Sequence, residues 1–160
     1  MAATLAEHII SLIDPAGQLY YRLILVVGPA GSGKTEALQH VKERTGWPRL
    51  NLNLELARQL LELTERQRRL LLPCLLAELL EPYNSEVILL DNLEILFAVS
   101  FHQDPLRLLL GLARHRTVVA AWPGSITAGK LVYAEPGHPE YRRYPVQDFL
   151  VVTTTPNATG

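Results

Sequence analysis

The stretch that decides the fold is the apolar run Leu23-Ile24-Leu25-Val26-Val27, followed at once by Gly28-Pro29-Ala30-Gly31-Ser32-Gly33-Lys34-Thr35. The second part fits the P-loop pattern G-x-x-x-x-G-K-[ST], and it lies between a strand-like run and a helix-like segment, as a phosphate-binding loop requires. Its glycines leave room for successive backbone N–H groups to approach a polyphosphate. We therefore expect residues 28–35 to bind the phosphates of a nucleotide.

Two side chains at the end of this loop have distinct expected roles. Lys34 reaches the β and γ phosphates, and Thr35 offers its hydroxyl to Mg²⁺, an ion that keeps most of its waters and prefers few protein ligands. A helix that begins near Gly33 directs the positive end of its dipole toward the anion. The cofactors expected from the loop are thus ATP and Mg²⁺.

Length and composition bound the remaining possibilities. A chain of 160 residues predicts a single domain over residues 1–152, with a frayed tail over residues 153–160. The net charge of −1 provides no global attraction to nucleic acid or membrane, so any such contact is local. Neither a signal-peptide pattern nor a membrane-spanning apolar run is present, which predicts a cytoplasmic protein without membrane contact. Cys74, in an apolar run, is expected to be buried.

Hydrophobic periodicity predicts strands alternating with helices. The predicted helices cover residues 5–13, 34–44, 55–63, 65–80 and 104–115, and the predicted strands cover residues 23–27, 50–54, 87–90, 117–121, 131–134 and 149–152. Thr64 with Gln67 forms an expected capping box, Asp104 an expected N-cap, and Pro73 an expected kink. The pattern predicts an α/β fold, a three-layer P-loop NTPase core with a mainly parallel sheet of strand order 5-1-4-3-2 and no helical lid.

Asp91 closes the apolar run Val87-Ile88-Leu89-Leu90, and we expect it to act with Thr35 at the metal. Many P-loop ATPases place a glutamate directly after this aspartate, whereas Asn92 stands here; an amide can orient a water but cannot take its proton. Glu94 is the nearest replacement, because residues 92 and 94 share a side if the backbone stays extended. Glu94 fits a solvent-facing position in a first helical turn equally well.

Further candidates come from the second half of the chain. Ser125, after the strand at 117–121, is a candidate γ-phosphate sensor, although Pro123-Gly124-Ser125 also fits an ordinary turn. A neighbouring subunit could use Arg114, Arg116, Arg142 or Arg143 as an arginine finger, and each also fits a solvated surface position. The cluster Arg66, Arg68 and Arg69 lacks the interleaved aromatic residues that nucleic-acid binding favours.

The P-loop, the segment Asn51-Leu52-Asn53-Leu54-Glu55-Leu56 and the segment Leu89-Leu90-Asp91-Asn92-Leu93-Glu94-Ile95-Leu96-Phe97 together resemble the AAA+ and related additional-strand ATPases. The small size and residues 131–141 resemble, more narrowly, the BrxF family of type 3 BREX phage-defence systems. The resemblance implies an ATP-binding and ATP-hydrolysing component that works with other defence proteins on DNA, either by direct contact or through those partners.

Three hypotheses follow. The first is an Mg-ATP-dependent ATPase that acts as a switch or assembly component, with Lys34, Asp91, Asn92 and Glu94 at the reaction centre. The second is a nucleotide or small-molecule kinase, since the same loop serves phosphoryl transfer. The third is a nucleotide-binding scaffold with little turnover, which Asn92 suggests. Because no arginine obviously reaches its own site, we also expect nucleotide-dependent self-association into a homo-oligomer.

Overall fold

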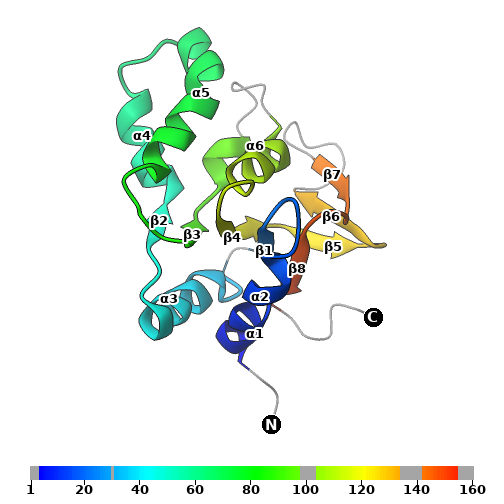
Figure 1. Cartoon of the computed structure of the whole chain (residues 1–160). Coiled ribbons are helices and arrows are strands. Elements are labelled where there is room, and N and C mark those ends of the chain that lie inside the picture. Colours follow the sequence, from blue (N-terminus) through cyan, green and yellow to red (C-terminus); the bar gives the residue numbers. More distant parts are fainter. Residues whose placement is uncertain (1–3, 30, 98–103, 134–141, 155–160) are drawn as a thin grey trace.

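Strand β1 (Leu23–Gly28) lies inside the molecule, and all six of its residues are buried. An uninterrupted apolar strand of this kind fits the interior of a parallel sheet, because both of its faces pack against other elements. The structure is a computed structural model that describes residues 4–29, 31–97, 104–133 and 142–154 (Figure 1). Of the frayed tail predicted over residues 153–160, Thr153 closes the last strand and the N–H of Thr154 donates to the main-chain oxygen of Val27 (3.0 Å), so the prediction was wrong for these two residues; the rest lies outside the described residues.

Four further strands complete a five-stranded sheet, and every neighbouring pair in it is parallel. They are β2 (Arg49–Asn51), β3 (Val87–Asp91), β4 (Thr117–Pro123) and β8 (Leu150–Thr153), in the order β2-β3-β4-β1-β8. The observed order differs from the expected 5-1-4-3-2 at one edge. Strands β1 to β4 have the expected order. The place beside β1, expected for the fifth strand of the chain, is taken by the last strand, β8.

The reason for this difference is a second sheet. The short strands β5 (Ser125–Thr127), β6 (Lys130–Tyr133) and β7 (Arg142–Pro145) pair antiparallel with one another, so none of them joins the parallel sheet. Trp122 links the two sheets, since its indole N–H donates to the main-chain oxygen of Val132 (3.2 Å). Phe97 packs edge-on against Trp122 and stacks on Tyr133.

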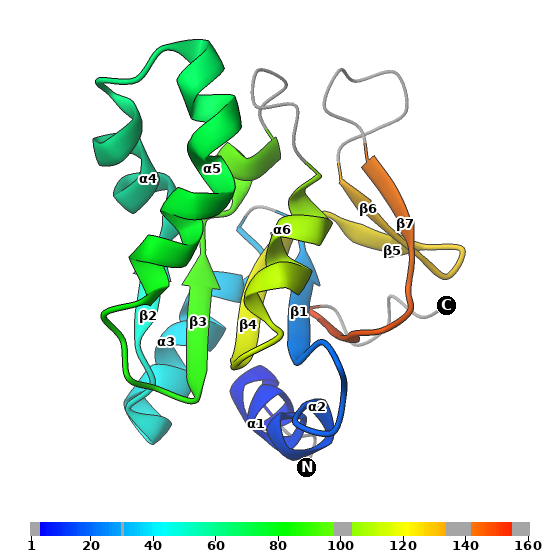
Figure 2. The same cartoon turned by 45° about the horizontal axis from the view of Figure 1, so that its top comes forward.

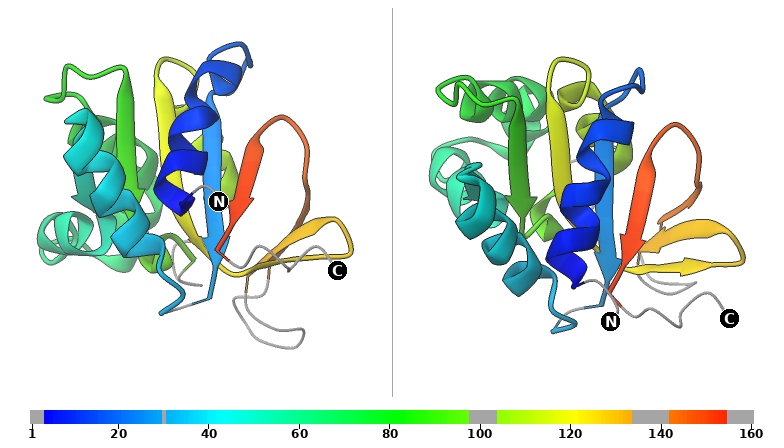
Figure 3. Two further views of the ribbon diagram at one scale, coloured as in Figure 1. Left: turned by 90° about the horizontal axis from the view of Figure 1, so that it is seen from below. Right: turned by 60° about the horizontal axis from the view of Figure 1, so that its bottom comes forward.

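Helices cover both faces of the parallel sheet, as Figures 2 and 3 show, which confirms the mainly parallel α/β architecture. One face packs on α1 (Leu5–Ser11), α2 (Ile13–Ala16) and α3 (Lys34–Thr45). The other packs on α4 (Leu52–Leu60), α5 (Glu65–Leu80), η1 (Glu94–Phe97) and α6 (Pro105–Leu112). Alternate residues of β1 serve the two faces, with Leu25 in one core and Val26 in the other.

The predicted strand over residues 50–54 was wrong in its second half. Strand β2 ends at Asn51, whose side-chain oxygen accepts a hydrogen bond from the N–H of Leu54 (3.0 Å) and caps α4. The alternation of leucine and asparagine therefore marks a strand-to-helix junction. Within α4, Leu52, Leu56 and Leu60 are buried at a spacing of one helical turn.

The residues that cap the amino ends of two other helices were predicted correctly. Thr64 and Gln67 form the capping box of α5, and the Asp104 carboxylate caps α6. Pro73 lies inside a continuous α5 and does not divide it. Cys74 is exposed, so the expectation of burial was wrong: α5 buries one stripe of leucines, Leu72, Leu76 and Leu80, and Cys74 faces away from it.

The other helix boundaries differ modestly from the prediction. The first predicted helix is present as two short ones, and α6 ends at Leu112, before the predicted His115. Among the described residues, no helix combines the length and apolar character needed to cross a membrane.

Candidate functional site

The P-loop connects the carboxyl end of β1 to the amino end of α3, at the carboxyl edge of the parallel sheet. Gly33 has a φ of 100°, a left-handed conformation that a side chain would strain. At Gly28 an added Cβ would collide with the side chains of Ser32 and Thr154, so this position is too crowded for any larger residue. Ala30 lies outside the described residues.

Lys34 is the first residue of α3 and only 8% exposed. Its ammonium donates hydrogen bonds to the main-chain oxygens of Gly28 (2.5 Å) and Pro29 (2.8 Å), which holds the side chain against the loop. Burial lowers the pKa of Lys34 below its ordinary value, and the nearby carboxylates of Glu94 and Asp91 oppose this shift. The cation thus lies between its own loop and two acidic residues, Asp91 at the end of β3 and Glu94 just after it.

Asp91 is the last residue of β3 and is 2% exposed. One carboxylate oxygen accepts a hydrogen bond from the N–H of Asn92 (2.9 Å), and the other pairs with the guanidinium of Arg49 (3.1 Å). The register of β2 on β3 explains the pair, because Asn51 lies beside Asp91 and Arg49 lies two residues earlier on the same face. Arg49 was missed by the sequence analysis.

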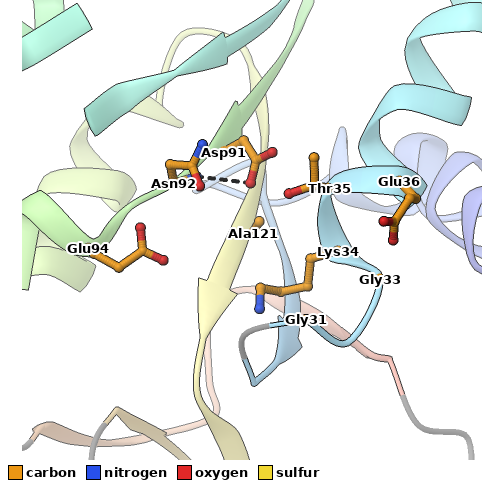
Figure 4. Close-up of a pocket in the computed structure, with 9 residues that line it drawn as sticks. All are labelled: Gly31, Gly33, Lys34, Thr35, Glu36, Asp91, Asn92, Glu94 and Ala121. Carbon is orange, nitrogen blue, oxygen red and sulfur yellow. Dashed lines mark hydrogen bonds between the residues drawn. The ribbon is translucent and has the colours of Figure 1, made fainter. Parts of the chain in front are cut away.

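The backbone turns sharply after Asp91, because Asn92 has a φ of 56°. An extended course up to Glu94 was one of the two readings of the sequence, and the structure shows the other: Glu94 begins the 3₁₀ helix η1. It still lines the same cavity as Lys34, and Figure 4 shows its carboxylate entering from the side opposite α3.

Asn53 holds the segment that carries Glu94. Its amide N–H₂ donates to the Glu94 carboxylate (3.1 Å), its amide oxygen accepts from the N–H of Ile95 (2.9 Å), and its main-chain N–H donates to the oxygen of Asn92 (3.1 Å). The second asparagine of the Leu-Asn-Leu-Asn-Leu run was the only sequence signal for this residue.

These residues meet around one cavity of about 180 Å³ at the carboxyl edge. Its lining is Gly31, Gly33, Lys34, Thr35, Glu36, Asp91, Asn92, Glu94 and Ala121. Glu36 and Ala121 were not expected there. Of the other predicted loop residues, Gly28, Pro29 and Ser32 lie in the loop outside this lining.

The donor set suits Mg²⁺. Thr35 and Asp91 both line the cavity and offer oxygen atoms, the ligands that this ion prefers, and a phosphate-bound Mg²⁺ needs few of them. Among the described residues, no group of three or more His, Cys, Asp or Glu side chains could hold a metal by itself. A metal in this cavity would therefore depend on phosphate oxygens and water for most of its coordination.

Ser125 does not line the cavity. It begins β5 in the antiparallel sheet, is exposed, and has its hydroxyl 3.3 Å from that of Thr127. Its role as a sensor stays a prediction.

None of the finger candidates with a described side chain lines the cavity in its own chain. Arg114 and Arg116 precede β4, at the amino edge of the sheet, and Arg143 lies in β7. The side chain of Arg142 lies outside the described residues.

No protein-family model and no curated protein matches this chain. Among solved structures it matches that of PCH-2 from C. elegans, an AAA+ ATPase, at 16% identity and a TM-score of 0.45. The match covers 93% of this chain and 41% of PCH-2, so the chain spans less than half the length of that protein. At this degree of likeness nothing about function follows from it.

Proposed function

We propose that this protein is an Mg-ATP-dependent ATPase that works as a cytoplasmic switch. The observation that carries the proposal is the convergence of Lys34, Thr35, Asp91 and Glu94 on one cavity at the carboxyl edge of a parallel sheet. Ligands bind outside the carboxyl ends of the strands in open α/β sheets, and this cavity combines a cation for phosphate, oxygen donors for metal and a carboxylate for water.

Each side chain has a role that its chemistry supports. Lys34 would leave the carbonyl groups of its loop and bind the β and γ phosphates, while Thr35 and Asp91 would supply oxygen atoms to hold Mg²⁺. When bound, Mg²⁺ neutralises charge that develops on the phosphate oxygens.

Glu94 takes a proton from the attacking water, a task that the neighbouring Asn92 cannot perform. Asn53 orients the Glu94 carboxylate through its amide N–H₂. Asn92, beside Asp91, orients the water.

The finer assignment is an AAA+-like ATPase of the BrxF type, acting with other defence proteins, with copies of itself and with DNA. The position of β4 between β1 and β3 supports an additional-strand core. The domain assignment, a single P-loop domain over residues 1–152, accords with one sheet that includes both β1 and β8.

A scaffold with little turnover is the second candidate. Arg49 favours it, because its guanidinium already neutralises Asp91 and would compete with Mg²⁺ for that carboxylate. The kinase hypothesis has less support, since no arginine is among the residues that line the described cavity.

The test is to replace Lys34 by alanine and to measure ATP affinity by calorimetry and phosphate release by colorimetry. Lys42→Ala is the matched control, because Lys42 is an exposed lysine on the same helix. We expect Lys34→Ala to weaken ATP binding at least tenfold and to abolish release, and Lys42→Ala to leave both unchanged. Unchanged affinity in Lys34→Ala contradicts the proposal, whereas tight binding without release in the wild type favours the scaffold.

A further inference from the structure

Three loops meet at the amino edge of the parallel sheet, opposite the P-loop; in Figure 2, where β1 and β3 point upward, this edge is at the bottom. Residues 20–22, 114–116 and 83–86 precede β1, β4 and β3, which are neighbours in the sheet. Main-chain hydrogen bonds join them: the N–H of Arg22 donates to Ala113 (2.8 Å), and that of Thr117 donates to Glu86 (2.8 Å). The loops therefore form one fixed surface.

A hollow of about 400 Å³ opens in this surface, and none of its seven lining residues is aliphatic. Arg22 and Arg116 line it, and each is anchored by a main-chain oxygen: Arg22 donates to Arg114 (3.2 Å) and Arg116 to Tyr83 (3.0 Å). A bond to a neutral carbonyl leaves the guanidinium charge in place and four of its five N–H donors for other partners. Glu86 is the single carboxylate in the lining.

Two exposed aromatic rings belong to the loops of this surface. Tyr20 is 66% exposed, packs edge-on against Tyr21 (4.7 Å between ring centroids) and has the Arg114 guanidinium 5.1 Å from its own centroid. Tyr83 is 38% exposed and lines the hollow. Large exposed rings held in place by neighbours cost little conformational entropy when a ligand stacks on them.

We propose that this amino edge, defined by Tyr20, Arg22, Tyr83, Arg114 and Arg116, binds single-stranded nucleic acid. Guanidinium groups bind phosphates and tyrosine rings stack on bases, and this combination is typical of single-strand binding without sequence preference. A duplex hides the faces of its bases, and an apolar peptide would need aliphatic pockets that this polar hollow lacks.

The inference deepens the proposed function, which includes DNA among the partners, by naming a surface and the single-stranded form of nucleic acid, and it uses none of the residues of the ATP site. It also gives Arg114 and Arg116 a task other than that of an arginine finger. Because the two sites lie at opposite edges of the sheet, ATP and nucleic acid bind without competing.

The first test measures binding of a fluorescent oligothymidylate of about 15 nucleotides, long enough for a typical single-strand site, by anisotropy across salt concentrations. Arg22→Gln/Arg116→Gln removes two charges from the hollow. Arg58→Gln/Arg66→Gln removes two exposed charges from α4 and α5 and is the matched control. We expect at least tenfold weaker binding for the first pair only, with a salt slope smaller by about 1.4, since each phosphate contact on a single strand contributes about 0.7.

The second test uses Tyr20→Ala, because an exposed ring can be removed without disturbing the core. We expect about tenfold weaker binding with an unchanged salt slope, since stacking is not an ionic contact. Unfolding temperature and ATP affinity are measured for every variant, and both are expected to stay near wild type in Tyr20→Ala.

Equal losses in the control pair would overturn the proposal, because binding would then follow net charge. So would tighter binding of a duplex than of the single strand, undiminished binding in Tyr20→Ala, or displacement of the oligonucleotide by ATP. Failure of this proposal leaves the Lys34 test untouched, so the two sites are judged separately.

Discussion

At the carboxyl edge of the parallel sheet, the acidic side chains are held by side chains of another element, whereas at the amino edge the arginines are held by main-chain oxygens. Asp91 forms an ion pair with Arg49, and Glu94 accepts a hydrogen bond from the neutral amide of Asn53, so both carboxylates have side-chain partners within the chain. Arg22 and Arg116 donate to neutral main-chain oxygens, so their charges remain at the surface, where Glu86 is the one carboxylate in the lining of the hollow. The carboxyl edge thus holds its acidic side chains through contacts with other side chains, and the amino edge presents arginines held by the backbone, with the Glu86 carboxylate in the same hollow.

The largest effect is expected for Glu94→Gln, which tests whether a residue at the carboxyl edge catalyses ATP hydrolysis. Glu94→Gln keeps the shape of the side chain and the acceptor for Asn53 but removes the base. We expect phosphate release to fall by about 10²- to 10⁴-fold while ATP affinity changes little. Glu78→Gln, on the exposed side of α5, is the control. Full turnover in Glu94→Gln would assign the base to another residue.

The next largest effect is expected for Arg49→Gln, which tests whether the Arg49–Asp91 pair stabilises the fold more than a surface ion pair does. Arg49→Gln leaves a carboxylate that is 3% exposed without its partner, and we expect the free energy of unfolding to fall by about 2 kcal/mol, since Arg49 itself is 27% exposed. Mg²⁺ should raise the unfolding temperature of the variant more than that of the wild type, because the ion no longer competes with a guanidinium.

The matched control for Arg49 is Arg44→Gln. Arg44 pairs with Glu7 at 3.6 Å, and both side chains are about half exposed, at 55% and 48%. Its loss should cost less than about 1 kcal/mol and show no dependence on Mg²⁺. Thermal unfolding with and without Mg²⁺ compares the two variants, and equal behaviour would remove the distinction between them.

The smallest effect is expected for Asn53→Ala, which tests whether the hydrogen bond from Asn53 orients Glu94 for the reaction. Asn53→Ala removes the donor to Glu94 and the acceptor for Ile95. We expect kcat to fall about tenfold with KM unchanged, because orientation of the base matters in the reaction and not in ATP binding. Gln59→Ala, exposed on the same helix, is the control. A change in KM alone would make Asn53 a binding residue.

Local patterns in the sequence predicted what depends on local structure. The P-loop, the strand that ends at Asp91 and the caps at Thr64 and Asp104 are all set by residues close in the chain. The Leu-Asn-Leu-Asn-Leu run led to a wrong strand prediction for residues 52–54, because the same residues fit both an alternating strand and a strand that ends at a helix N-cap. The hydrogen bond from the N–H of Leu54 to the side chain of Asn51 distinguishes the two.

Residues whose role depends on distant pairing could not be found in the same way. Arg49 contacts Asp91 across 42 positions because of the register of β2 on β3. The amino-edge hollow needs three loops separated in the chain by three crossovers, from β1 to β2, from β2 to β3 and from β3 to β4, and no single segment contains it. The edge position of β8 beside β1 likewise depends on distant pairing, because β5, β6 and β7 pair with one another in the second sheet and do not join the parallel one.

The aromatic contact between Trp122 and Phe97 makes the intrinsic fluorescence of Trp122 a probe of η1. Phe97 is the last residue of η1 and Glu94 the first, so a movement of η1 as a unit would shift the ring that packs against the indole of Trp122 (4.9 Å between centroids). The chain has two tryptophans, and the other, Trp47, follows α3. A Trp47→Phe variant would thus report motion of the segment that carries Glu94 as a change in the fluorescence of one residue, in real time and without a label.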